Sequence, residues 1–194
     1  MAVLVALMLA AASIDLVRRG TEATRWKEYA FVLAAGLIAG IFGLANNLVT
    51  SSISPEYFIF GKAVPTESIS RGAALLGLKA GFVVGIFSGG LCVYVATRKS
   101  AYPPFSLRNL MLLSWRPFVI AVTFAVLLPL MFGKLDPLGF EAKLNPPLKA
   151  SQVSGFVRVW WIHLGVYVGL MIGVLWVIFD VAGIRRREVA PPRP

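Results

Sequence analysis

The sequence predicts an all-α integral membrane protein, a polytopic bundle of four transmembrane helices with a possible short fifth helix at the N-terminus. Of the 194 residues, 58% are hydrophobic and only 14% are charged, whereas an average soluble domain carries about 25% charged residues. The apolar residues are also gathered into long runs, and the basic residues are clustered between alternate runs. These three observations together exclude a water-soluble domain.

Four apolar runs predict the four helices in order. They are residues 29–49, 73–96, 115–132 and 156–182. A helix needs about 20 apolar residues to cross a bilayer core of about 30 Å, whereas a strand of a membrane barrel needs only about 10. The lengths of the runs therefore favour helices.

The segment that precedes the first run, residues 1–16, is shorter. It is apolar from residue 2 to residue 12, and Asp15 then precedes Arg18 and Arg19. It has neither the positive leader nor the small-residue cleavage site of a signal peptide. We expect either an interfacial helix or a short fifth span, and a fifth span would place the N-terminus outside.

Basic residues alternate along the connections as the positive-inside rule describes. Lys and Arg dominate the segments before the first run, between the second and third runs, and after the fourth run. We therefore expect these segments, and the C-terminus, on the cytoplasmic side of the membrane. The predicted organisation is an N-terminal apolar segment and cytoplasmic linker (1–28), the bundle (29–184), and a basic, proline-rich cytoplasmic tail (185–194).

The net charge of +10 bears on the expected partners. A basic balance is typical of nucleic-acid binding, but here the charges flank membrane spans. We expect contacts with the lipid bilayer, through anionic headgroups on the cytoplasmic side, and with other membrane protein subunits or copies of the chain. No nucleic-acid partner is expected.

Glycines recur at intervals of four on three of the predicted helices. This spacing keeps them on one helix face, where small residues allow close helix packing in lipid. We favour static packing, within the bundle or between copies, over a moving interface as in transporters. The third helix lacks such a stripe and is expected to face lipid. The glycines are Gly36, Gly40, Gly77, Gly81, Gly85, Gly89, Gly165, Gly169 and Gly173.

Two ionisable residues lie inside predicted spans. Lys79 lies roughly opposite the glycines of the second helix, and we favour snorkelling toward headgroups over a functional intramembrane charge. His163 shares a face of the fourth helix with Trp160 and Tyr167, near Arg158. The alternatives are a proton-handling or ligand-binding cluster and an interfacial aromatic belt with a hydrogen-bonded histidine; we favour the belt.

The outer connection after the first helix contains a second candidate site. Pro55 and Gly61 bracket a turn or a short re-entrant helix. The residues between them and just after them that could contact a ligand or partner are Glu56, Tyr57, Phe58 and Lys62. Glu56 and Lys62 could pair with each other, or with Arg158. A lid over an outward-facing pocket and an interfacial anchor fit this connection equally well.

The sequence contains no arrangement that indicates an enzyme. There is one cysteine and one histidine, so no metal-ligand spacing, catalytic triad or cofactor motif is present. We therefore expect no enzymatic activity, no metal and no cofactor. The favoured function is a structural or accessory subunit, and the alternative is a small transporter or channel component with Lys79, His163 and Glu56 along its path.

Two motifs resemble a family of uncharacterised bacterial multi-pass integral membrane proteins. The first is the outer-loop sequence Pro55-Glu56-Tyr57-Phe58, followed by Gly61 and Pro65; the second is Trp160-Trp161, His163 and Tyr167 on a glycine-rich fourth helix. The resemblance covers residues 46–187, apart from the connection 133–154. It implies a membrane bundle and draws attention to Glu56, Tyr57, Phe58 and His163, but it assigns no activity.

Overall fold

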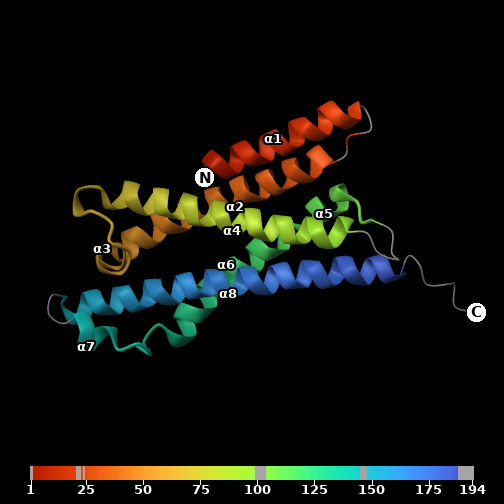
Figure 1. The fold of residues 1–194 in the computed structure, drawn as a ribbon. Coiled ribbons are helices and arrows are strands. Elements are labelled where there is room, and N and C mark those ends of the chain that lie inside the picture. Colours follow the sequence, from red (N-terminus) through yellow and green to blue (C-terminus); the bar gives the residue numbers. More distant parts are fainter. Residues whose placement is uncertain (1, 21–22, 24, 99–103, 145–147, 188–194) are drawn as a thin grey trace, which may run out of the picture. The chain divides into compact units, whose positions relative to one another are not determined.

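A computed structural model describes residues 2–20, 23, 25–98, 104–144 and 148–187. Within these residues all regular structure is helical, so the predicted all-α fold is confirmed (Figure 1). The elements are α1 (Ala2–Arg19), α2 (Arg25–Ile53), α3 (Pro55–Lys62), η2 (Thr66–Ser68), α4 (Ile69–Thr97), α5 (Leu107–Leu113), α6 (Arg116–Phe132), α7 (Phe140–Leu144) and α8 (Ala150–Arg187).

Four helical segments of the described chain are long and apolar enough to cross a membrane, as predicted. They are Arg25–Ile53, Thr66–Thr97, Leu107–Phe132 and Ala150–Arg187. This finding supports a multi-pass membrane protein. Helices α2, α4 and α8 extend beyond their apolar runs at both ends, because a helix can continue into the headgroup layer, where polar side chains are solvated.

The third segment differs from the prediction at its start. A short helix, α5, and a turn at Ser114 and Trp115 precede α6, so the segment begins at Leu107 rather than at residue 115. In its most apolar stretch only 17% of the residues are buried, a smaller share than in the other three segments. This agrees with the expectation that the third helix faces lipid.

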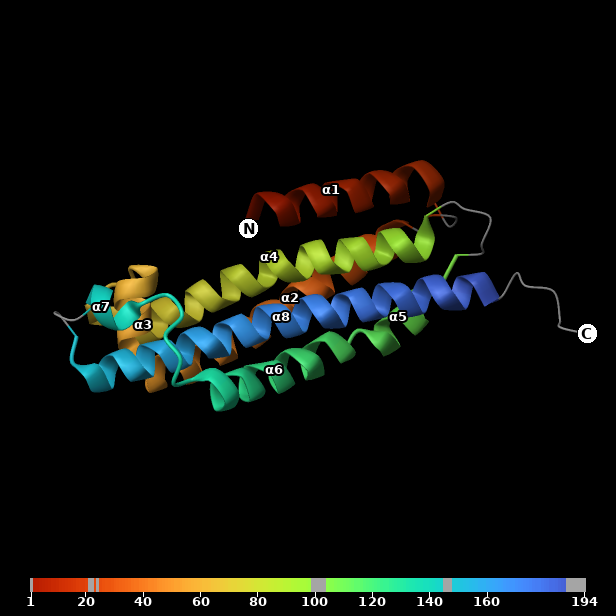
Figure 2. The same cartoon turned by 90° about the horizontal axis from the view of Figure 1, so that it is seen from below.

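The N-terminal segment forms a helix of 18 residues, α1. It is not among the four candidate spans. Its junction with α2 is held by Asp15, which is buried, accepts a hydrogen bond from the backbone N–H of Arg25 (3.0 Å) and forms an ion pair with Arg19 (3.5 Å). In both views α1 and α2 run in opposite directions from the end at which they are joined (Figures 1 and 2).

The chain divides into two compact units, and each is described by itself. Unit 1 consists of Met1–Phe42, Leu78–Trp115 and Val174–Pro194. Unit 2 consists of Gly43–Gly77 and Arg116–Gly173. Helices α2, α4 and α8 contribute residues to both units. The predicted boundaries at residues 28 and 184 stay a prediction, although α8 continues as a helix to Arg187.

In unit 1 the glycines of α2 and α4 face the opposite helix. A Cβ atom added at Gly81 or Gly85 would lie closer than 3.0 Å to the backbone carbonyl oxygen of Ala39 or Ala35. Gly36, Gly40 and Gly89 have their nearest neighbours in the same two helices. The absence of side chains at these positions is therefore what permits the two backbones to lie so close.

In unit 2 the glycine contacts join two pairs of helices. Gly77 of α4 packs against the backbone of Gly43 in α2, and the glycines of α8 pack against the backbone of α6. The contacts to α6 are made by Gly165 with Phe124, by Gly169 with Ala121 and by Gly173 with Pro117. The glycines could pack within the bundle or between copies of the chain, and the contacts described here are within the chain.

Candidate functional site

The candidate site lies in unit 2 and begins with α3. The hydroxyl of Ser54 accepts a hydrogen bond from the backbone N–H of Tyr57 (3.4 Å), and Pro55 occupies the first helical turn; both are favourable at a helix start. Ala63 ends the helix in the left-handed region (φ 53°). The connection between α2 and α4 therefore contains a short helix rather than only a turn.

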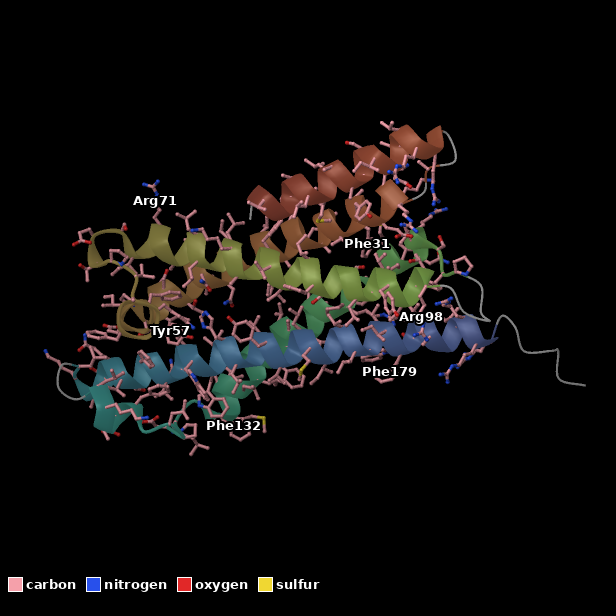
Figure 3. All side chains as sticks on the ribbon, in the orientation of Figure 1. Phe31, Tyr57, Arg71, Arg98, Phe132 and Phe179 are labelled. Atoms are coloured by element: carbon pink, nitrogen blue, oxygen red, sulfur yellow. The ribbon has the colours of Figure 1, made fainter. Side chains whose placement is uncertain are left out.

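The aromatic side chains of α3 are packed into unit 2. Tyr57 is 4% exposed and Phe58 is 0% exposed, whereas Phe60 remains outside. The Tyr57 ring lies 5.2 Å from the Phe156 ring of α8 and 5.3 Å from the Phe58 ring, measured between centroids (Figure 3 labels Tyr57). These contacts attach the short helix to α8. The buried cluster comprises Tyr57, Phe58, Val64, Ala73, Phe156 and Val159.

His163 lies beside this aromatic cluster and is itself buried. Its ring stacks on Tyr57 at a centroid distance of 4.8 Å and an interplanar angle of 25°, and it meets the edge of Phe58 at 5.9 Å. An aromatic face of this kind attracts positive charge. Of the cluster predicted on α8, His163 is therefore part of the protein interior, whereas Tyr167 is exposed.

Both ring nitrogens of His163 have an oxygen within hydrogen-bonding distance. Nε2 lies 3.1 Å from Oδ1 of Asn47 in α2, and Nδ1 lies 3.0 Å from the carbonyl oxygen of Val159. The amide Nδ2 of Asn47 in turn donates to the carbonyl oxygen of Ala73 in α4 (2.9 Å). This chain of polar contacts connects three helices through the interior of unit 2.

The predicted ion pair of Glu56 is wrong. Its two carboxylate oxygens instead accept hydrogen bonds from the hydroxyl of Ser54 (2.9 Å) and from the Nε2 amide of Gln152 (3.0 Å). Among the described contacts Glu56 has no ion pair with Lys62 or Arg158. Glu56 occupies the first turn of α3, where the helix dipole favours a negative charge, so a basic partner is not required.

Lys62 is exposed, but it lies close to the same cluster. Its Nζ atom is 5.6 Å from the centroid of the Tyr57 ring. Burial raises the pKa of the Tyr57 phenol far above its ordinary value of 10.0, and the charge of an ionised Tyr167 raises it further. The phenol is thus kept neutral at physiological pH.

The remaining predicted residues divide into two groups. Trp160 packs against the buried cluster and against Phe140 of α7, with ring centroids 5.9 Å apart. Lys79 and Arg158 are exposed, and no described contact brings them to His163. Tyr167 is 49% exposed. The site therefore gathers Glu56, Tyr57, Phe58, Lys62, Trp160 and His163, but not Lys79 or Arg158.

Three residues of the site were not predicted: Asn47, Ser54 and Gln152. Asn47 had a visible signal, since it is one of two asparagines near the end of an apolar run, and a polar residue inside a span is expensive unless it is paired. Ser54 precedes Pro55 and Glu56, a typical helix start. Gln152 had no signal, because its partner Glu56 is 96 residues away.

The chemistry open to this site is proton binding and hydrogen bonding. In the part of the chain that the structure describes, no group of three His, Cys, Asp or Glu side chains could hold a metal ion. The buried polar groups are an imidazole, an amide and a hydroxyl, with a carboxylate at the margin.

Comparison with known proteins provides no relative. No protein-family model, no curated protein and no solved structure matches this chain.

Proposed function

We propose that this protein is a non-enzymatic structural or accessory subunit of a membrane assembly in a bacterial inner membrane. The observation that carries the proposal is the way the polar groups of the candidate site are occupied. His163 and Glu56 each have two polar atoms, and all four face partners from the chain itself. Groups whose polar atoms all face the protein itself leave little room for contacts with a passing solute.

The glycine contacts support the same proposal. In both units the glycine faces pack against helices of the same chain, which is typical of a static bundle. Such a bundle leaves its other helix faces for lipid or for partner subunits. The large exposed side chains of α8 are Tyr167, Met171, Ile172, Leu175, Trp176, Phe179 and Ile184; Figure 3 shows Phe179 pointing away from the helices around it.

The alternative is a small transporter or channel component, and one observation favours it. A histidine and an asparagine are buried next to each other on two candidate spans. Ionisable and polar residues inside a membrane are costly, and by default they indicate a functional path. Lys79 does not add to this path, because it lies on an exposed face of α4.

Reconstitution distinguishes the two functions. The purified chain alone, in sealed liposomes, is expected to conduct protons and small ions no faster than empty liposomes. In native membranes, chemical cross-linking is expected to give one product with a fixed ratio of this chain to a partner. Flux that is lost in His163→Phe but kept in the control Tyr94→Phe, at an exposed position of α4 outside the site, would establish the transporter; a chain that is never cross-linked to another would contradict the subunit.

The placement in the membrane is part of the proposal. We infer that the segments rich in Lys and Arg lie on the cytoplasmic side with the C-terminus, where they contact anionic headgroups. We also infer that α1 lies within the lipid layer, because it runs back in the direction opposite to α2 (Figures 1 and 2) and exposes Val3, Leu9 and Val17. An interfacial helix would instead lie across the spans.

A depth profile along α1 tests this placement. Fluorophores attached to Val3→Cys, Leu9→Cys and Val17→Cys, each in a Cys92→Ala background, are quenched by lipids brominated at different chain depths. A helix within the lipid layer gives a different depth at each position. Equal, shallow depths at all three positions would establish an interfacial helix.

A further inference from the structure

A neutral His163 ring has too few hydrogen-bond donors for the acceptors that surround it. A neutral imidazole has one N–H donor and one bare nitrogen, and only the imidazolium form has two donors. Both ring nitrogens of His163 face oxygen acceptors, the carbonyl of Val159 at 3.0 Å and Oδ1 of Asn47 at 3.1 Å. A neutral ring can satisfy only one of them, and the other nitrogen would direct its lone pair at an oxygen.

The orientation of the Asn47 amide does not remove the conflict. Its Nδ2 atom donates to the carbonyl oxygen of Ala73 at 2.9 Å, so its Oδ1 atom must face His163. Turning the amide over would pair Nδ2 with the histidine, but it would place Oδ1 against the Ala73 carbonyl. One repulsive contact would then replace another. Because Asn47 and His163 are both 6% exposed, water has little access to relieve it.

We propose that His163 is a proton-binding site: in this structure the ring carries both protons, and the second proton joins α8 to α2 through Asn47. Two acceptor oxygens and the face of the Tyr57 ring then all meet positive charge favourably. When the second proton leaves, either the Asn47 contact or the Val159 contact becomes repulsive, and the attachment between the two helices within unit 2 loosens.

The charged and titratable groups around the His163 ring decide whether its neutral or its charged form is favoured. From α3 they are Lys62 and the phenol of Tyr57, and from α8 Tyr167, which acts on Tyr57. The contacts from α2 and α4 are the uncharged amide of Asn47 and the Ala73 carbonyl. The positive charge of Lys62, close to the Tyr57 ring, opposes a charged imidazole, and the two oxygens with the Tyr57 face favour it.

The chain offers a direct measurement, because it contains a single histidine. Full-length protein with ¹⁵N-labelled histidine, purified through a tag that contains no histidine and placed in lipid nanodiscs, gives ring nitrogen signals from His163 alone. These signals distinguish two protonated nitrogens from one protonated and one bare nitrogen. At about pH 6, where histidine commonly titrates, we expect both nitrogens to be protonated; a bare nitrogen at that pH would overturn the proposal.

Variants of Asn47 then test the role of the acceptor. Asn47→Leu removes one acceptor and should lower the proton affinity of His163 about tenfold or more, which is about one pH unit in the titration midpoint. Asn47→Asp keeps an acceptor, adds negative charge and should raise the midpoint. Opposite shifts support the proposal, and shifts in the same direction contradict it. If Asn47→Leu does not fold, the direction of the Asn47→Asp shift decides.

Asn46 supplies a matched control. It is the same residue type on the same helix, and its only described contact is through its backbone carbonyl, which accepts from the hydroxyl of Thr50. Asn46→Leu should leave the midpoint unchanged. A shift as large as that of Asn47→Leu would show that the titration responds to a general change in the bundle, and the proposal would fail. The proposal does not depend on the subunit function, since both a subunit and a transporter can bind this proton.

Discussion

At the scale of single residues, Gly81 shows how little space separates two helices of unit 1. A methyl group added there would lie closer than 3.0 Å to the carbonyl oxygen of Ala39, a backbone atom that cannot move without moving α2. We expect Gly81→Ala to destabilise the protein by about 1–3 kcal/mol, the usual cost of overpacking. The measurement is unfolding in mild detergent, followed by circular dichroism.

Gly90 is the control for this prediction. It lies on the same helix, α4, and an added methyl group would meet nothing within 4 Å. Gly90→Ala should therefore be neutral or should stabilise the helix by up to about 1 kcal/mol, because alanine is the better helix former. Equal losses in the two variants would mean that the close approach of α2 and α4 is not what stabilises this region.

Tyr57 makes stability depend on alkaline pH. Its phenol has an ordinary pKa of 10.0 when the chain is unfolded, and burial raises the pKa in the folded protein. Above about pH 10 the unfolded chain loses this proton and the folded protein keeps it, so the stabilisation present below that pH is lost as the pH rises. The free energy of unfolding should fall by up to about 1.4 kcal/mol for each further pH unit.

A substitution isolates this contribution. Tyr57→Phe cannot ionise and should unfold with a weaker dependence on pH between about pH 9 and about pH 11. Tyr94→Phe, at an exposed position of α4, should retain the dependence of the unmodified protein. The prediction fails if the pH dependence of Tyr57→Phe matches that of Tyr94→Phe.

The structure brings several of the predicted site residues together, with partners that the sequence did not indicate. Helical spacing identified the face of α8 that contains His163, because periodicity follows from helix geometry alone. The partner Asn47 is 116 residues away, and its identity depends on how α2 and α8 are rotated and offset along their axes. Opposite charge suggested an ion pair for Glu56, but a helix N-terminus and two neutral donors satisfy that carboxylate instead.

At the scale of elements, the last turn of α8 acts on the end of α4. Arg185 was expected to begin a cytoplasmic tail, but it lies inside α8 and is only 3% exposed. Its guanidinium donates to the carbonyl oxygens of Val95 and Arg98, the latter at 3.0 Å. A helix leaves its last carbonyls without partners, so this arginine closes the end of α4.

Arg185→Ala should therefore destabilise unit 1 more than a neighbouring substitution does. We expect a loss of about 2–3 kcal/mol, because hydrogen bonds to charged groups contribute about 1.5–3 kcal/mol and the carbonyls of Val95 and Arg98 lose their donors. Arg186→Ala, at an exposed position, should change stability by less than about 0.5 kcal/mol. Hydrogen exchange at the last amides of α4 provides the measurement. Similar exchange rates in both variants would refute the closing role of Arg185.

Short helices were predictable only where proline or glycine marks their ends. Pro55 and Gly61 indicated the site of α3, because proline begins helices and glycine interrupts them. Helix α7 had no comparable signal in its five residues. It is held instead by the packing of Phe140 and Leu144 on the buried clusters of unit 2. Such packing depends on contacts that are distant in the sequence.

For the whole molecule, the four long helices were predictable because the bilayer imposes one length scale on the sequence. A run of about 20 apolar residues has few other uses, and each predicted run corresponds to one candidate span in the structure. The division into two units was not predictable, since it cuts through α2, α4 and α8. The point along each helix at which one unit ends and the other begins depends on side-chain packing rather than on hydropathy.

The inferred orientation leads to the last prediction, on the whole molecule. The only cysteine, Cys92, is buried, so single cysteines can be placed in a Cys92→Ala background. Ser106→Cys, just before α5, and Glu141→Cys in α7 are both at exposed positions. If positive charge keeps the basic connections inside, a membrane-impermeant maleimide applied to intact cells should label Glu141→Cys and should reach Ser106→Cys only after permeabilisation. The reverse pattern would invert the orientation, and labelling of both in intact cells would exclude an odd number of spans between them.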